Sequence, residues 1–292
     1  MRREANHHRS TRRAVAVGGV LLSTVVLGQV ALSGPVAAVP GLLIRTTVGP
    51  SNSVAKSQSA VCPAGTTVIG GGGAITGSGL GQVGMDIVQP LADAGLYSVT
   101  GREDPNGVTG NWAVTASAIC APTPAGYQVV TGHSAMNSVN PKFLELSCPV
   151  GKRAIGGGGA ALALGSGSSD VLLEDLRVNL SSVTVAGVEA GNAFADNWSL
   201  DVSVICVDPL AGEQRVTVDS VSSSVVDRSV TATCPAGKRL HGVGGEIVGG
   251  EGQVRLTELR PTSSTTATVR AATDENGFSG SWKVRAYAVC AT

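Results

Sequence analysis

Carboxylates recur at corresponding places in three stretches of the chain that otherwise alternate between apolar and polar residues. They are Asp86, Glu174, Asp175 and Glu258. Two carboxyl groups about 5–9.5 Å apart across a cleft could hydrolyse a glycosidic bond, one as acid and the other as nucleophile or base. An extracellular hydrolase is therefore one hypothesis, and the least favoured one.

A second set of oxygen-bearing side chains lies in two segments rich in Asp, Asn and Gly. The segments are Asp104-Pro105-Asn106-Gly107 and Asp274-Glu275-Asn276-Gly277. Carboxylate and amide oxygens are ligands for calcium, but the same residue types also form tight turns. The corresponding segment from Glu189 to Asn192 does not keep the ligand set. We therefore expect turns, and no metal site.

Other groups that commonly act in catalysis are scarce. Beyond residue 38 the chain has two histidines, His133 and His241, at unrelated places. Clusters of glycine after residues 69, 155 and 241 superficially resemble phosphate cradles. A P-loop, however, ends in Gly-Lys-Ser/Thr, and a dinucleotide fold needs a helix after the strand. We predict no catalytic residue and no cofactor, and we expect the glycines to let chains approach closely or bend.

The cysteines, glycine clusters and tryptophans belong to one threefold repeat. A Cys-Pro-x-Gly motif recurs twice at an interval of 86 residues, and each copy is followed by glycines, a tryptophan and, eight residues later, a second cysteine. The tryptophans are Trp112, Trp198 and Trp282, and the cysteines are Cys62, Cys120, Cys148, Cys206, Cys234 and Cys290. Self-similarity at a fixed period indicates a repeat architecture. We assign residues 39–122, 123–208 and 209–292 to three β repeats.

Six cysteines in three equivalent pairs, with none left over, predict disulfides in an exported chain. Equivalence of the repeats allows either three bonds within repeats or a cyclic set between neighbours. The internal set is simpler, and it pairs Cys62 with Cys120, Cys148 with Cys206 and Cys234 with Cys290. Closing a loop of 58 residues stabilises a repeat by roughly 4 kcal/mol on the chain-entropy model.

Within each repeat, apolar and polar residues alternate with a period of two, which predicts half-buried strands. In the strand that begins at Trp282, small apolar residues share the face of the tryptophan, while Lys283, Arg285 and Tyr287 lie on the other. We therefore expect the tryptophans to be structural, packed in the core, and not sugar-stacking platforms.

The predicted fold class is all-β, with three tandem antiparallel repeats of about 86 residues. Five or six strands per repeat fit two arrangements. One is a single pseudo-three-fold body resembling a β-prism, and the other is three small β-sandwiches on short linkers. The first is slightly favoured.

Residues 1–38 have the three-part composition of a signal peptide. Five arginines precede an apolar run from Ala14 to about Leu32, and small residues lead to a predicted cleavage after Ala38. Cleavage after Ser33 and an uncleaved membrane anchor are the alternatives. Removing residues 1–38 leaves about four net negative charges, which argues against nucleic acid or an anionic membrane as partner. No later apolar run is long enough to span a membrane.

The succession of Cys-Pro-x-Gly, Gly-Gly-Gly, Trp and a terminal Cys over residues 45–292 resembles uncharacterised repeat modules of secreted actinobacterial proteins. A weaker architectural resemblance connects it to β-prism proteins of the vitelline-membrane outer-layer and jacalin types. The resemblance implies an extracellular location and supplies no catalytic residue. The leading hypothesis is a secreted, non-enzymatic structural or interaction protein of the bacterial surface, with an extracellular protein or glycan as partner. A lectin-like carbohydrate-binding module is the alternative.

Overall fold

The computed structural model describes residues 39, 41–163, 170–190, 194 and 196–292, which belong to one compact unit. The predicted signal peptide and its cleavage site lie outside the described residues. Within the described part, no helix has the length and apolarity needed to cross a bilayer.

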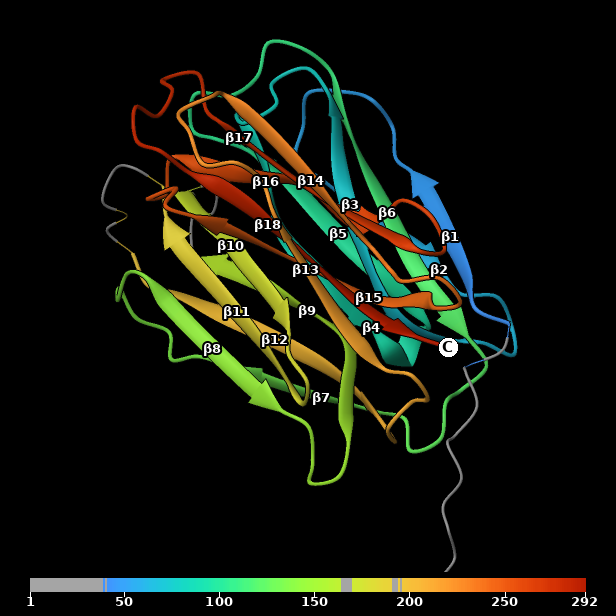
Figure 1. The fold of residues 1–292 in the computed structure, drawn as a ribbon. Coiled ribbons are helices and arrows are strands. Elements are labelled where there is room, and N and C mark those ends of the chain that lie inside the picture. The colour runs from blue at the N-terminus through green and yellow to red at the C-terminus, as the bar shows by residue number, and fades with distance from the viewer. Residues whose placement is uncertain (1–38, 40, 164–169, 191–193, 195) are drawn as a thin grey trace, which may run out of the picture. The chain divides into compact units, whose positions relative to one another are not determined.

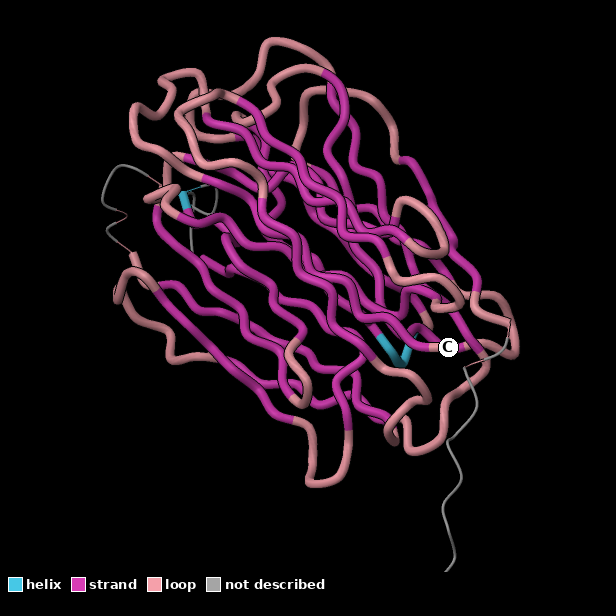
Figure 2. Tube along the Cα trace, viewed as in Figure 1, coloured by secondary structure: helices cyan, strands magenta, loops and turns pink. Residues whose placement is uncertain are grey.

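Each repeat contributes six β-strands, and the described residues contain no α-helix (Figure 2). The first repeat has β1 (Leu43–Val48), β2 (Lys56–Val61), β3 (Thr67–Gly77), β4 (Val83–Leu91), β5 (Leu96–Glu103) and β6 (Trp112–Ala121), with a short 3-10 helix η1 (Ala92–Ala94). The second has β7 (Gln128–His133), β8 (Lys142–Ser147), β9 (Arg153–Ala163), β10 (Val171–Val178), β11 (Ser182–Glu189) and β12 (Trp198–Val207). The third has β13 (Gln214–Asp219), β14 (Asp227–Thr233), β15 (Arg239–Val248), β16 (Val254–Pro261), β17 (Thr266–Thr273) and β18 (Lys283–Ala291).

The strands form three antiparallel sheets of six strands, and each sheet joins three strands of one repeat to three of another (Figure 1). The first sheet has the order β1-β6-β3-β16-β17-β14, the second β2-β5-β4-β9-β12-β7 and the third β13-β18-β15-β10-β11-β8. The all-β prediction is confirmed. Because every sheet crosses a boundary between repeats, the arrangement is the pseudo-three-fold, β-prism-like one, and not three separate sandwiches.

The glycine clusters lie where the three repeats meet. Strand β3 pairs with β16, β9 with β4 and β15 with β10, each at the middle of a sheet. A Cβ atom added to the first glycine of each cluster would lie 2.0–2.4 Å from a carbonyl oxygen of another repeat; these glycines are Gly70, Gly156 and Gly242. Only a residue without a side chain permits this backbone approach.

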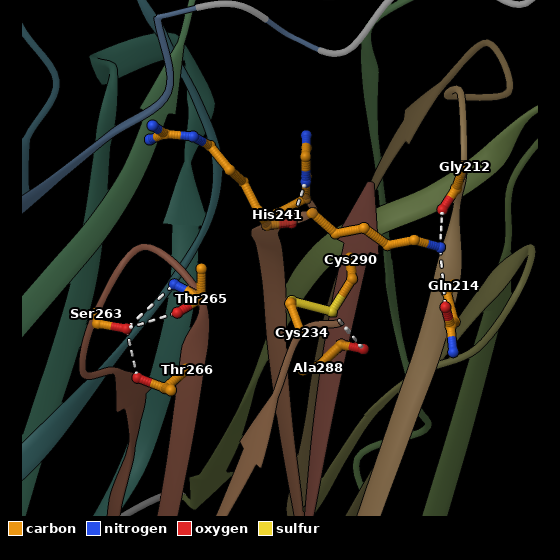
Figure 3. Close-up of a disulfide and its surroundings, with 11 residues drawn as sticks. Gly212, Gln214, Cys234, His241, Ser263, Thr265, Thr266, Ala288 and Cys290 are labelled. Atoms are coloured by element: carbon orange, nitrogen blue, oxygen red, sulfur yellow. Dashed lines mark hydrogen bonds between the residues drawn. A yellow bond between two sulfur atoms is a disulfide. The ribbon is translucent and has the colours of Figure 1, made fainter. Parts of the chain in front are cut away.

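The disulfides are the predicted internal set, and no cysteine is free. Cys120 lies in β6 of the first sheet, whereas Cys62 directly follows β2 of the second. The bond between them therefore joins two sheets. The same holds in the other repeats, so the three bonds tie the three sheets together in a cycle. Figure 3 shows the third bond, between Cys234 and Cys290, beside His241.

Candidate functional site

The three tryptophans are fully buried and share one setting, in which a cation lies over the ring. The pairs are Lys56 with Trp112 at 3.3 Å, Lys142 with Trp198 at 4.6 Å and Arg228 with Trp282 at 5.4 Å from the ring centre. The cation precedes the first cysteine of its repeat by six residues, a signal that the sequence reasoning missed. With no exposed surface, these rings offer no face to a sugar from solvent.

The two histidines lie apart and have different surroundings. His133 ends the edge strand β7 and is exposed, whereas His241 in β15 is buried. His241 Nδ1 lies 2.9 Å from the Arg239 carbonyl oxygen, and Nε2 has no partner. Burial lowers the pKa of His241. Neither imidazole is part of a nucleophile–base arrangement among the described residues.

The carboxylates predicted as candidate acids are distributed over three sheets. Asp86 is in β4 of the second sheet, Glu174 and Asp175 are in β10 of the third, and Glu258 is in β16 of the first. Carboxylates of different repeats therefore do not gather from this set into one cleft. Each lies near the seam where its repeat meets the next.

The seam of the third sheet holds a carboxylate pair that the sequence did not reveal. Asp175 in β10 lies directly opposite Glu246 in β15, which belongs to another repeat. Tyr287 donates a hydrogen bond of 2.5 Å to Glu246, and Arg177 forms an ion pair of 2.6 Å with Asp175. Burial, opposed by Arg177 and reinforced by Glu246, raises the pKa of Asp175 to about 8.

Glu174, the neighbour of this pair, is the extra residue of a β-bulge in β10. The bulges of the other repeats place Asp86 in β4 and Thr257 in β16 at the same position. Asp86 forms an ion pair with Arg102, whereas no hydrogen bond or ion pair reaches Glu174 within the described part of the chain. Burial and the nearby charge of Glu246 raise the pKa of Glu174 to about 7.

Glu174 lines a surface cavity of about 560 Å³ on the third sheet. Its walls include Phe143 of β8, which is 65% exposed, and the apolar side chains of Val188 and Ile247. Glu251, in the turn after β15, adds a further carboxylate. None of the described residues that line the cavity is a lysine or arginine, so this lining combines an apolar wall with negative charge. This is the candidate functional site.

The turns considered for calcium come together in a second cavity, of about 380 Å³. Its lining includes Asp104, Asn106, Asp170, Arg255, Asp274 and Asn276. The carboxylate of Asp104 accepts hydrogen bonds from the backbone N–H groups of Asn106 and Gly107 at 3.1 and 3.0 Å. That of Asp274 accepts them from Asn276 and Gly277 at 3.0 and 3.1 Å.

These aspartates hold turns, as expected, and the buried Arg255 lies among their negative charges. Among the described residues, no group of three or more His, Cys, Asp or Glu side chains is arranged to hold a metal ion.

Comparison with known proteins adds no relative. No family model matches the chain, and a search of curated proteins finds no match.

Proposed function

We propose that the chain is a secreted, non-enzymatic interaction protein of the bacterial surface. It presents one binding site, the cavity beside Glu174, on a rigid disulfide-closed scaffold. One observation carries the proposal. The cysteines, tryptophans and glycines that recur in all three repeats are committed to the interior, whereas the cavity is built from residues that only the second and third repeats supply.

The scaffold supports an extracellular role. Three disulfides that link the sheets pairwise are typical of proteins from oxidising compartments.

The tryptophans act structurally in this proposal, since each fills the core beneath a cation and donates its indole N–H to an acceptor. The acceptors are Glu103, Glu189 and the carbonyl oxygen of Val225.

The cavity supports a binding role for the second repeat. Its volume lies within the roughly 300–1,000 Å³ typical of ligand sites, and Phe143 supplies an exposed aromatic ring, a frequent anchor of recognition. In each repeat, one residue directly follows the cation that lies over the tryptophan. This residue is Phe143 in the second repeat, and Ser57 and Ser229 in the other two. The aromatic anchor is thus particular to one sheet.

A lectin-like module is the second candidate. The aromatic ring of Phe143 beside the amide of Asn140 and the carboxylate of Glu174 also suits a sugar, which stacks on rings and exchanges hydrogen bonds with polar groups. A hydrolase has less support, because the candidate acids of different repeats lie in different sheets.

Binding arrays test the proposal. The mature protein is applied to glycan and peptide arrays together with Phe143→Ala and the matched control Ser229→Ala. We expect saturable binding that Phe143→Ala abolishes at unchanged melting temperature and that Ser229→Ala retains. Sugar-competed binding on the glycan array favours the lectin. Hydrolysis of an arrayed compound that survives repurification and is lost in Glu174→Gln contradicts a non-enzymatic role.

A further inference from the structure

In the first repeat, the carboxylate at the β-bulge position, Asp86, pairs with a neighbouring cation. Asp86, 5% exposed, accepts a charge-assisted hydrogen bond from the Nε of Arg102 on the neighbouring strand β5. Arg102 lies directly before Glu103, the acceptor for the indole N–H of Trp112. The position of the arginine can therefore be found in the other repeats, because it directly precedes the residue that accepts the indole N–H.

The second repeat keeps the carboxylate and lacks the arginine. Glu189 accepts the indole N–H of Trp198 at 3.0 Å, so Val188, the residue before it, corresponds to Arg102. Val188 lies opposite Leu172 in β10, as Arg102 lies opposite Gly84 in β4. Where the first repeat places a guanidinium beside its bulge carboxylate, the second has an isopropyl group and an open cavity.

Among the described residues, no neighbouring cation takes the place of the missing arginine. Arg177 is paired with Asp175, and Arg285 is paired with Asp219 and Glu246. Lys142 lies over the Trp198 ring and donates a hydrogen bond to Asn137. The sequence segments 164–169 and 191–195 contain no Lys or Arg. A carboxylate with no counter-ion, in a cavity of negative charge, favours a cationic ligand.

We propose that the cavity binds the guanidinium group of an arginine side chain from a partner polypeptide, placed against Glu174 as Arg102 is placed against Asp86. The inference rests on the proposed function, whose ligand class it names. A guanidinium is planar and weakly hydrated, so it can pair with a carboxylate and stack on an exposed ring such as Phe143. The methylene stem of arginine packs on apolar side chains, which Val188 and Ile247 provide.

Titration with a minimal probe tests the inference. The mature protein is titrated with Nα-acetyl-arginine amide and, as the neutral isostere, Nα-acetyl-citrulline amide, with amide chemical shifts as the readout. We expect saturable shifts near Val188, Gly249 and Gly250, and an affinity at least about tenfold higher for arginine, because a charge-assisted hydrogen bond is lost with citrulline. Glu174→Gln should remove this difference, and the matched variant Asp86→Asn should keep it.

The variant Val188→Arg places a guanidinium group of the chain itself beside Glu174. We expect the new side chain to occupy the cavity, so that the variant no longer binds the arginine probe. Its melting temperature should be unchanged or higher. Where this variant does not fold, Glu174→Gln alone decides.

Equal affinity for both probes, or an undiminished preference for arginine in folded Glu174→Gln, overturns the inference. If the arginine probe does not bind but Phe143→Ala still abolishes array binding, only the ligand class is wrong. Absence of any binding by the folded protein on the arrays contradicts the proposed function itself.

Discussion

One backbone position, the β-bulge, carries three different side chains in the three repeats. Asp86 is paired with Arg102, Glu174 lacks a partner among the described residues, and Thr257 donates a hydrogen bond of 3.3 Å to the Arg270 carbonyl oxygen. An ion-paired acid, an unpaired acid and a neutral hydroxyl thus occupy the equivalent bulge position of three strands, β4, β10 and β16. The fold therefore does not require a carboxylate there, and the acid in the second repeat is free to serve binding.

Buried carboxylates at the third seam give the stability a pH dependence. Burial raises the pKa of Asp175 to about 8 and, with the charge of Glu246, that of Glu174 to about 7, both above the roughly 4 of unfolded chains. The folded state thus binds protons more tightly, and stability is lost as pH rises through these values. We expect the melting temperature to rise by several degrees from pH 8.5 to 6.5, measured by circular dichroism.

Asp175→Asn should weaken the dependence of the melting temperature on pH, because an amide binds no proton in this range and the largest raised pKa is removed. The control Asp93→Asn, at an exposed residue of η1, should leave it unchanged. A melting temperature that falls between pH 8.5 and 6.5 contradicts the prediction.

His241 opposes this trend at lower pH. Burial lowers the pKa of His241 below its ordinary value of 6.5. The unfolded chain therefore binds a proton more readily than the folded one, and the free energy of unfolding decreases as the pH falls below 6.5. Isoleucine occupies the corresponding position in the other repeats, at residues 69 and 155. We expect His241→Ile to stabilise the protein by about 1–3 kcal/mol, because it removes a buried nitrogen without a partner.

Urea unfolding at pH 5.5 and 7.5 measures this effect, which should be larger at pH 5.5. A variant that is less stable than the wild type at both pH values contradicts the prediction.

At the scale of strands, the alternating pattern predicted β6, β12 and β18 as half-buried strands. Burial alternates along the first part of β18, as predicted, whereas every residue of β6 is buried, so both of its faces pack in the core. The pattern could not predict the pairing of β4 with β9 or of β10 with β15, because each partner comes from another repeat. Consecutive glycines carry no alternation at all, yet they form the centres of β3 and β9. Their strand character follows from the close approach of neighbouring backbones.

Gly156 tests that close approach. A Cβ on this residue would lie 2.2 Å from the Ile69 carbonyl oxygen and 3.0 Å from the Gly70 Cα, both backbone atoms that cannot rotate away. We expect Gly156→Ala to cost about 3 kcal/mol or more, the upper part of the range for overpacking, or to prevent folding. Denaturant unfolding of the purified protein provides the measurement.

The matched control is Gly132→Ala in the edge strand β7. Its Cβ would meet methyl groups of Leu146 at 3.5 Å and of Val202 at 3.8 Å, which are ordinary contacts, and alanine loses less conformational freedom than glycine on folding. We expect stability equal to the wild type or slightly higher. Equal effects of the two substitutions would exclude backbone contact as the reason for the glycines.

At the scale of the molecule, the spacing of the cysteines predicted three equivalent units and allowed two disulfide sets, of which the simpler, internal one is present. The sequence left the choice between a prism and three sandwiches open, because linkers of a few residues permit both. The cavity could not be predicted, since Phe143 comes from β8, Glu174 from β10 and Glu251 from the turn after β15. Alignment of the repeats residue by residue would have shown one part of it, the valine that stands where the first repeat has Arg102.

The shared sheets make the repeats dependent on one another. In a fragment of residues 39–122, β3 and β4 would lose their partners β16 and β9, exposing two unpaired edges and the glycine face. The disulfide constrains the unfolded chain but cannot replace these hydrogen bonds. We expect no folded monomer of this fragment; at high concentration, three copies can complete the cycle of half-sheets and form a trimer. Circular dichroism melting and sedimentation measure both, and a monomeric fragment with a cooperative transition would establish the repeats as independent domains.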